Sequence, residues 1–491
     1  MTTAGNYDVN SSGVNTTGNQ AGASTVRFNS PSALTLTFTA TTAQNMQGIL
    51  VTPNIGAHNV SITGGGLEFV RSPNPGAADG VIWQNNTSGY LNFSSIIEAG
   101  RQAGQSNGLV QAGPGTVVYS GVNSFELPTY LNGGYSVVSA DSGFGQAADG
   151  SAVNLDGGTV VGNASFAMDN SGSNVRPVVL GGNGGGLAAT TGNTMTIDGA
   201  VSGSGALTIG VGTLPGSGPG TANPTAVAGN GSVVLSGANS YAGGTTINAG
   251  TLLADSTDTT NGSTGSGSVT VASGATLGGT GQIRGSLSVH GIITAGSAAS
   301  GVAPGVLTAN APGQTTTFAG GGAYDVKIDS SSGNGTPGTN WDEVVLSALA
   351  VTSSNGNAFN VTLNSLNPGK ASGAIGGLIP SLWTLGTMTA APTGLTLSTS
   401  GPTILAVAGT GAGAPTIMSG DSGIFALNTS AFDSANGINP SSSYFALELI
   451  NTSGTNYSLD VYTNAPEPCA AMLMLAGGLP LLLARRRRKT C

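Results

Sequence analysis

The chain has 491 residues, of which 83 are glycine and only 7% are charged, and its formal net charge at neutral pH is −9. Outside a basic run near the C-terminus, only 7 Lys and Arg stand against 21 Asp and Glu, so the body of the chain lacks the clustered cations that phosphate contacts need, which argues against nucleic-acid binding. Helix formers with opposed charges are nearly absent, which argues against an α-rich fold. Short alternating runs of Val, Ile, Leu and Thr instead predict an all-β protein.

The first 26 residues are polar and lack a basic segment followed by an apolar one, so they show no secretory signal peptide. We expect residues 1–26 to be a disordered or truncated N-terminus. Strand-like alternation begins near residue 27 and continues to residue 463. We expect residues 27–463 to form one repetitive β region.

Two segments 116 positions apart share a pattern that needs no gaps. Residues 115–125 read GTVVYSGVNSF, and residues 231–241 read GSVVLSGANSY. The register continues to two later glycine pairs, Gly134 with Gly250 and Gly158 with Gly274. Chance does not keep glycines, Asn-Ser pairs and alternating apolar positions in phase over about 45 residues, so we interpret the segments as copies of a stacked repeat.

Each copy contains short strands separated by glycine or asparagine turns. In the second copy, Val233 and Leu235 alternate with their neighbours, a turn follows at 236–240, and further strands are predicted at 245–248 and from 251. This order favours a parallel β-helix, in which each coil adds one strand to each sheet about 4.8 Å above the last. We therefore predict that Val, Leu and Thr side chains stack inward, layer on layer.

The segment 235–252 closely resembles the autotransporter-associated β-strand repeat, and 197–207 is similar to its usual lead-in. The first copy departs from that repeat where Glu126, Leu127 and Pro128 replace a Gly-Gly bend. The resemblance covers 95–360 and is best over 95–290. It implies the passenger-type, right-handed parallel β-helix of secreted surface proteins.

Histidine and cysteine offer no site in the body of the chain. His58 and His290 each lie among apolar and small neighbours, and we interpret both as turn or surface residues and not as ligands or bases. Both cysteines, Cys469 and Cys491, lie in the C-terminal tail, so the body has no disulfide or thiolate metal site. We predict no cofactor, no metal ion and no catalytic residue.

One concentration of acidic residues needs separate consideration. It contains Asp325, Asp329, Asp342 and Glu343. A calcium site or a catalytic pair is one interpretation of such residues. Because they alternate with apolar residues such as Val326 and Val344, we instead predict that all four face solvent.

The C-terminal segment 464–491 has three parts in a fixed order. They are Pro466, Glu467 and Pro468; the apolar run 469–484; and Arg485, Arg486, Arg487, Arg488 and Lys489. The apolar run predicts a transmembrane helix about 24 Å long, a little short for a bilayer. The basic run should act as a cytoplasmic stop, with nearly the whole chain across the membrane.

This order of parts resembles the PEP-CTERM sorting tail. The resemblance implies an exosortase, an integral-membrane processing enzyme, as the partner that recognises the tripeptide during export. It also implies a location at the cell envelope, the outer surface or the extracellular medium, and an association with exopolysaccharide, which bacteria with such tails typically make. The alternative is a permanent anchor that is never cut, although Gly477, Gly478 and Pro480 weaken the helix.

Two functions are compatible with these observations. The favoured one is an exported, non-enzymatic β-helical surface or matrix protein that serves in adhesion or a biofilm. The alternative is a carbohydrate-active β-helical enzyme, a polysaccharide lyase or a glycosidase. Two carboxylates about 5–10 Å apart in a groove would favour the enzyme.

Overall fold

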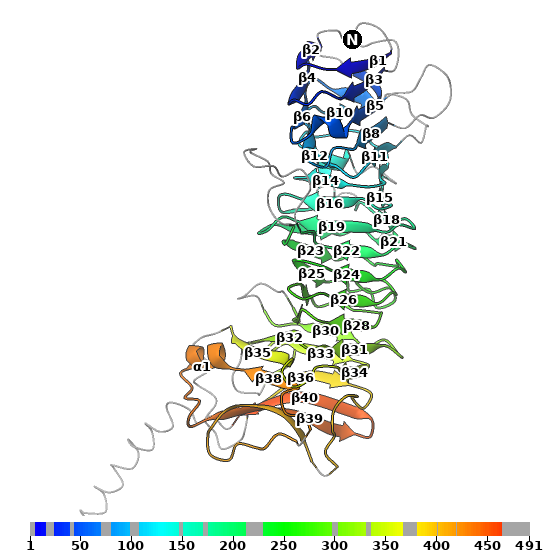
Figure 1. Cartoon of the computed structure of the whole chain (residues 1–491). Helices are drawn as coiled ribbons and strands as arrows, with labels where there is room; N and C mark the ends of the chain where they lie inside the picture. The colour runs from blue at the N-terminus through cyan, green and yellow to red at the C-terminus, as the bar shows by residue number, and fades with distance from the viewer. Residues whose placement is uncertain are drawn as a thin grey trace, which may run out of the picture. The chain divides into compact units, whose positions relative to one another are not determined.

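The computed structural model shows an all-β protein (Figure 1). It describes residues 5–15, 24–39, 44–69, 80–98, 108–146, 151–169, 175–212, 229–296, 303–329, 335–366, 381–399, 401–418 and 420–463. Within these residues there is one α-helix, α1 (Ser430–Asn436), and there are two 3₁₀ turns, η1 (Pro53–Ile55) and η2 (Asp141–Phe144). The chain divides into two compact units, 1–269 and 270–491, and each is described by itself.

Unit 1 consists of parallel strands in three sheets, which we call A, B and C. Sheet A contains, in order of pairing, β1 (Asn6–Val9), β3 (Ser24–Phe28), β5 (Gln44–Val51), β8 (Gly80–Gln84), β11 (Leu109–Ala112), β13 (Thr129–Leu131), β15 (Val153–Leu155), β18 (Val178–Leu180) and β21 (Val201–Gly203), with β7 (Leu67–Phe69) and β10 (Ile97–Glu98) beside it. Sheet B contains β2 (Gly13–Asn15), β4 (Leu34–Phe38), β6 (Val60–Gly64), β9 (Tyr90–Phe93), β12 (Thr116–Tyr119), β14 (Tyr135–Val138), β16 (Thr159–Gly162), β19 (Gly185–Ala189), β22 (Leu207–Ile209) and β24 (Thr245–Ile247). Sheet C contains β17 (Phe166–Ala167), β20 (Thr194–Ile197), β23 (Ser232–Leu235) and β25 (Thr251–Ala254). From β1 to β16 the chain passes back and forth between sheets A and B, with β7 and β10 as additional strands. From β16 to β23 it passes through sheets B, C and A in turn, which is the arrangement expected of stacked β-coils.

The core of unit 1 follows from the alternation of side chains along each strand. In β4, Leu34, Leu36 and Phe38 are buried while the threonines between them are only partly covered. Because neighbouring strands are parallel and in register, buried positions stack on one another, as in this column of sheet B: Leu36, Ile62, Phe93, Tyr119 and Val138. Burial of each such side chain contributes about 1.5–3 kcal/mol. The predicted inward stacking is confirmed for this unit.

The two sequence copies adopt the same local backbone. Gly134 and Gly250 have positive φ angles, 65° and 68°, and a side chain at either would collide with a carbonyl oxygen, that of Gly115 or of Gly231. Those two oxygens also accept hydrogen bonds from matching amides, which belong to Tyr135 and Thr251. Glycine is required at both corners because only glycine tolerates this conformation and this approach without cost.

The copies nevertheless lie on different sheets. β12 and β14, in the first copy, belong to sheet B, whereas β23 and β25, at the same places in the second copy, belong to sheet C. Likewise, β13 lies in sheet A and its counterpart β24 in sheet B. After β12, sheet B gains four strands, β14, β16, β19 and β22, one for each further coil. β23 then follows β22 along the chain but lies in sheet C. The interval of 116 residues therefore comprises four whole coils and one step from sheet B to sheet C.

Unit 2 begins with parallel strands and ends with antiparallel ones. β26 (Val269–Val271) spans the boundary with unit 1. One parallel set contains β28 (Leu287–Val289), β31 (Thr315–Phe318) and β34 (Ala348–Val351). Another contains β27 (Thr276–Gly278), β29 (Ile292–Ile293), β32 (Ala323–Ile328), β35 (Phe359–Ser365) and β38 (Phe425–Asn428).

The remaining strands of unit 2 form what we call the mixed sheet. Its order is β30 (Val306–Ala309), β33 (Glu343–Leu346), β36 (Ser381–Met388), β40 (Asn456–Thr463), β39 (Tyr444–Ser453) and β37 (Thr403–Gly409). The pairs β36·β40, β39·β40 and β37·β39 are antiparallel. These pairs depart from the all-parallel stacking that we expected up to residue 463.

No helix among the described residues is long and apolar enough to span a membrane. The predicted transmembrane segment 469–484, the tripeptide Pro466–Pro468 and the basic run Arg485–Lys489 all lie outside the described residues. Of the predicted N-terminal segment 1–26, residues 5–15 and 24–26 are among the described ones, and they contain β1, β2 and the first residues of β3.

Candidate functional site

The two histidines occupy exposed positions. His58 lies in the loop before β6, and His290 follows β28, where its Nδ1 lies 3.4 Å from the Ser288 hydroxyl oxygen. The described part of the chain contains no group of three or more His, Cys, Asp or Glu residues placed to hold a metal ion.

The prediction that the acidic concentration faces solvent is wrong for Asp342. This residue is fully buried, and its carboxylate lies 2.8 Å from the Lys327 ammonium group, which is itself only 6% exposed. It also accepts hydrogen bonds from the backbone amides of Gly305 (3.0 Å) and Lys327 (2.9 Å). Burial raises the pKa of Asp342, and the charge and hydrogen bonds of Lys327 oppose that rise.

The other three acidic residues, Asp325, Asp329 and Glu343, are partly covered. Asp342 therefore joins neighbouring coils and presents no carboxylate to a substrate. Removing one member of a buried pair leaves an uncompensated charge, which costs about 3–5 kcal/mol.

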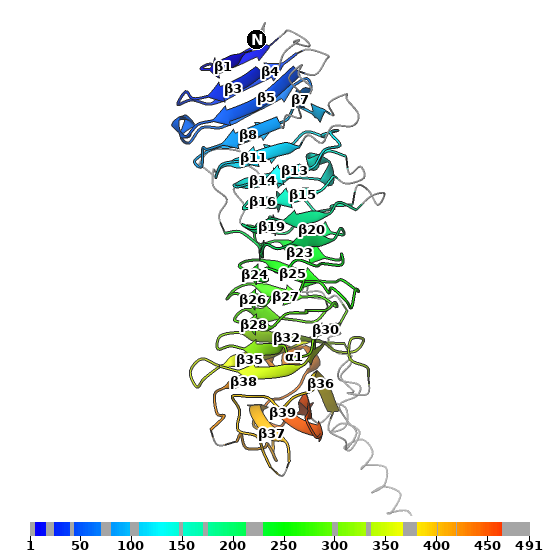
Figure 2. The ribbon, with the colours of Figure 1, turned by 90° about the vertical axis from the view of Figure 1, so that its right-hand side faces the viewer.

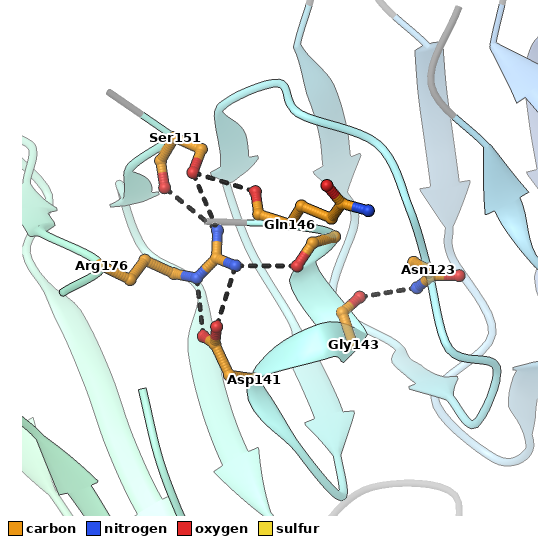
Figure 3. Close-up of polar contacts among 7 residues, drawn as sticks. Asn123, Asp141, Gly143, Gln146, Ser151 and Arg176 are labelled. Atoms are coloured by element: carbon orange, nitrogen blue, oxygen red, sulfur yellow. Dashed lines mark hydrogen bonds and ion pairs between the residues drawn. The ribbon is translucent and has the colours of Figure 1, made fainter. Parts of the chain in front are cut away.

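A second buried ion pair, in unit 1, was not predicted from the sequence (Figure 3). Arg176 is 1% exposed and donates from Nε to Asp141 of η2 over 2.7 Å. Its other N–H groups donate to Asp141 Oδ2, to the Gly145 carbonyl, and to the carbonyl and hydroxyl oxygens of Ser151. All five donors of the guanidinium are satisfied, so this arginine fastens a loop and has no donor left for a ligand.

The described surface of unit 1 contains a groove of about 620 Å³ on the outer face of sheet A. Figure 2 shows the strands that form its floor, β1, β3, β5 and β8, stacked one on the next. Two cross-strand rows of outward-facing residues line it. One row is Asp8, Arg27, Leu50 and Trp83; the other is Asn6, Thr25, Gly48 and Val81.

The polar end of the groove is held by an exposed ion pair. Arg27 donates from Nε and Nη2 to the two carboxylate oxygens of Asp8, each over 2.7 Å. The hydrogen bond with Arg27 lowers the pKa of Asp8, and the same bond raises the pKa of Arg27. Both side chains remain about half exposed, at 46% for Asp8 and 48% for Arg27. The pair is charged at neutral pH and accessible to a ligand.

The apolar end of the groove is an exposed tryptophan. Trp83 is 50% exposed, whereas the chain's other two tryptophans, Trp341 and Trp383, are 3% and 0% exposed. Gly48 lies in the row beside it and leaves the space between Thr25 and Val81 open. The arrangement combines a flat aromatic surface with hydrogen-bonding groups a few strands away, which suits an extended polar ligand with apolar faces.

Two carboxylates face each other in the mixed sheet. Glu448 of β39 is directly opposite Asp460 of β40, and the two residues are 7% and 2% exposed. Burial, and then the charge of Asp460, raise the pKa of Glu448 to about 7. Burial also raises the pKa of Asp460, against hydrogen bonds from Ser458 and Thr384. The two side chains are too well covered for a polymer to reach them, which argues against glycosidic chemistry at this pair.

Comparison with known proteins yields one family. The profile of the passenger-associated-transport repeat matches residues 227–254, the stretch that contains β23, β24 and β25. This match agrees with the autotransporter-associated repeats inferred from the sequence. No curated protein matches the chain.

Proposed function

We propose that the protein is an exported, non-enzymatic β-helical protein of the cell surface or extracellular matrix. The observation that carries this proposal is the passenger-associated-transport repeat at 227–254, which coincides with strands stacked in parallel on sheets B and C. Repeats of this kind are named for passengers, the exported parts of their proteins. A right-handed coil and a role in adhesion or a biofilm belong to the same proposal, with exopolysaccharide as the polymer the protein meets.

Sorting through the C-terminal tail is the second part of the proposal. It is supported by the order of tripeptide, apolar run and basic run in residues 466–489. An exosortase-type enzyme would act near Pro466–Pro468 once the basic run has stopped transfer.

Deletion of residues 485–489 should impair retention or processing of the precursor. The basic run is the part that cannot be carried cheaply through lipid, so its loss removes the stop signal. Fractionation of the producing cells, with immunoblotting of envelope and medium, measures the result. A matched control replaces the five residues with other Lys and Arg in a new order; unchanged fractionation of the deletion variant would contradict a sorting role.

The enzymatic alternative has one observation in its favour, the opposed carboxylates Glu448 and Asp460. Incubation of the purified chain with polysaccharides, followed by measurement of new reducing ends or unsaturated sugars, distinguishes the two functions. We expect no product. Product that disappears in Glu448→Gln would replace our proposal with a glycosidase or lyase.

A further inference from the structure

The outer face of sheet A places an aromatic side chain where a strand normally presents a small or polar one. Trp83, the fourth of the five residues of β8, is half exposed, with Leu50 of one neighbouring strand on one side and Ala112 of the other on the other side. Tyr130 of β13, 38% exposed, continues the neighbouring row beyond Val81 and Val110. Contiguous exposed apolar surface of this kind marks an interaction site.

The shape beside Trp83 depends on a glycine. Gly48 does not have a positive φ angle, and a Cβ there would meet Val81 O at 3.4 Å and Thr25 Cγ2 at 3.7 Å, which are ordinary contacts. Its backbone conformation does not require glycine. What glycine provides is an open space in the row, and the resulting groove of about 620 Å³ lies within the usual range for a ligand site.

The charge of the groove points to the class of ligand. Among its lining residues Asp8 and Arg27 are the charged ones, and they neutralise each other. The chain as a whole carries a net charge of −9, or near −14 without its C-terminal basic run, because 7 Lys and Arg then face 21 Asp and Glu. Anionic polymers are therefore repelled, while a neutral ligand with many hydroxyl groups pairs with both members of the ion pair.

We propose that this groove binds a neutral polysaccharide, with Trp83 as the platform on which a sugar ring stacks and Asp8 and Arg27 as the groups that bind its hydroxyls. A sugar ring presents C–H groups on its face and hydroxyls on its edge. The indole of Trp83 suits the face of one ring, and the guanidinium of Arg27 and the carboxylate of Asp8, two and three strands farther along the groove, suit the hydroxyls of another ring of the same polymer. The site rests on the proposed function, since a surface or matrix protein is the kind that meets such polymers.

The tryptophans supply a direct readout. Because Trp83 is half exposed while Trp341 and Trp383 are buried, quenching of fluorescence by acrylamide reports mainly on Trp83. The purified full chain is titrated with dextran, a soluble β-glucan and galactomannan, and with alginate as the anionic comparison. Affinity electrophoresis in the same polymers measures binding independently. We expect protection of the fluorescence and retarded migration with at least one neutral polymer, and neither effect with alginate.

Three variants localise the effect. Trp83→Ala and Gly48→Leu should each weaken binding at least tenfold, the first by removing the platform and the second by filling the space beside it. Trp83→Phe should retain part of the affinity. Val122→Ala removes a side chain that is 71% exposed on a turn after β12 and should leave binding unchanged.

Absence of binding to all the neutral polymers would overturn the site, and so would full affinity in both Trp83→Ala and Gly48→Leu. Concentration-dependent dimers that Trp83→Ala abolishes, measured by light scattering without polysaccharide, would assign the face to a second copy of the chain instead. These experiments use purified protein, so a negative result leaves export and sorting untouched. Conversely, failure of the fractionation test would not remove binding in solution.

Discussion

At the scale of single residues, the coils are held together by buried polar side chains that reach from one coil to the next. Asn123 accepts a hydrogen bond from the Ile97 amide over 2.9 Å and donates to the Gly143 carbonyl over 2.7 Å. Asn239, 116 positions later, does the same with the Val201 amide (2.8 Å) and the Ser263 carbonyl (2.7 Å). Each asparagine thus satisfies one backbone amide and one backbone carbonyl of neighbouring coils.

Replacement of Asn123 or Asn239 by alanine should lower the free energy of unfolding by about 2–4 kcal/mol in each case, because each change leaves one buried N–H and one buried C=O unsatisfied. Chemical denaturation of the purified variants measures this. Asn154→Ala is the control, since Asn154 is partly exposed and makes one 3.3 Å bond to the Thr129 carbonyl. A loss below 1 kcal/mol at Asn123 or Asn239 would contradict the role that we assign to them.

The sequence predicted where such residues lie but not what they do. Asn123 and Asn239 were identifiable from the repeat as turn residues, yet their partners are 20 to 38 positions away. The same distance concealed Asp342: alternation predicted a solvent-facing side chain, whereas Lys327 and two backbone amides, brought together by folding, make burial tolerable. The exposure of Trp83 was likewise not predicted, because alternation does not say which of the three tryptophans remains exposed.

At the scale of elements, period-two alternation predicts strands but not their partners. The strands at 232–235, 245–247 and 251–254 were predicted within a residue or two of their observed bounds. The alternation that continues to residue 463 also covered the ranges of β39 and β40, but it did not predict their antiparallel pairing. The two ranges are separated by a turn at Ser453–Asn456, and only the short length of that connection signalled a hairpin. Helix α1, with seven residues, is too short to leave a clear periodic pattern.

The β39–β40 hairpin should become less stable as the pH rises from about 4.5 to about 7. In that window folded Glu448 binds its proton while the unfolded chain has released it, so the folded state is favoured at the acidic end and its advantage is lost above pH 7. Burial also raises the pKa of Glu343. The hydrogen bond from Thr387 opposes that rise, and the nearby charge of Asp460 adds to it. Tyr462, whose pKa is raised to about 12 chiefly by burial, remains neutral throughout.

Urea denaturation at pH 5 and pH 8 tests this dependence. Glu448→Gln should raise stability at pH 8 by about 1–2 kcal/mol and flatten the difference between the two pH values, since an amide needs no proton. Glu126→Gln, at an exposed position in unit 1, is the matched control. Equal pH dependence in the native chain and in Glu448→Gln would mean that Glu448 is not the titrating group.

At the scale of the whole molecule, the alternation of apolar residues, and not composition alone, predicted the class of fold. A chain with 83 glycines and 7% charged residues would ordinarily be suspected of disorder, but inward alternation gave it a core in which large side chains such as Phe28, Phe93 and Tyr241 are fully buried or nearly so. Glycines serve the corners of the coils, and the few cations are in part reserved for buried pairs. Handedness and the ligand cannot be read from composition.

The purified chain should give a circular dichroism spectrum of β type and should resist limited proteolysis, because parallel stacking leaves few backbone groups of the strands open to a protease. Cleavage should be confined to connections between strands. Gel electrophoresis with mass analysis of the fragments identifies the sites. A spectrum typical of an unfolded chain, or rapid cleavage within β12–β25, would show that the glycine content prevents stable coils.

The second copy lies on sheet C where the first lies on sheet B, and this shift by one sheet has an evolutionary consequence. A duplicated segment in such a stack need not contain a whole number of turns, since the same corner glycines and asparagines serve on any side. An insertion or deletion that is not a whole number of turns instead moves all later residues of the stack onto a different sheet. Changes in length can thus make a surface such as that around Trp83 face a different direction, without a substitution of any residue in it.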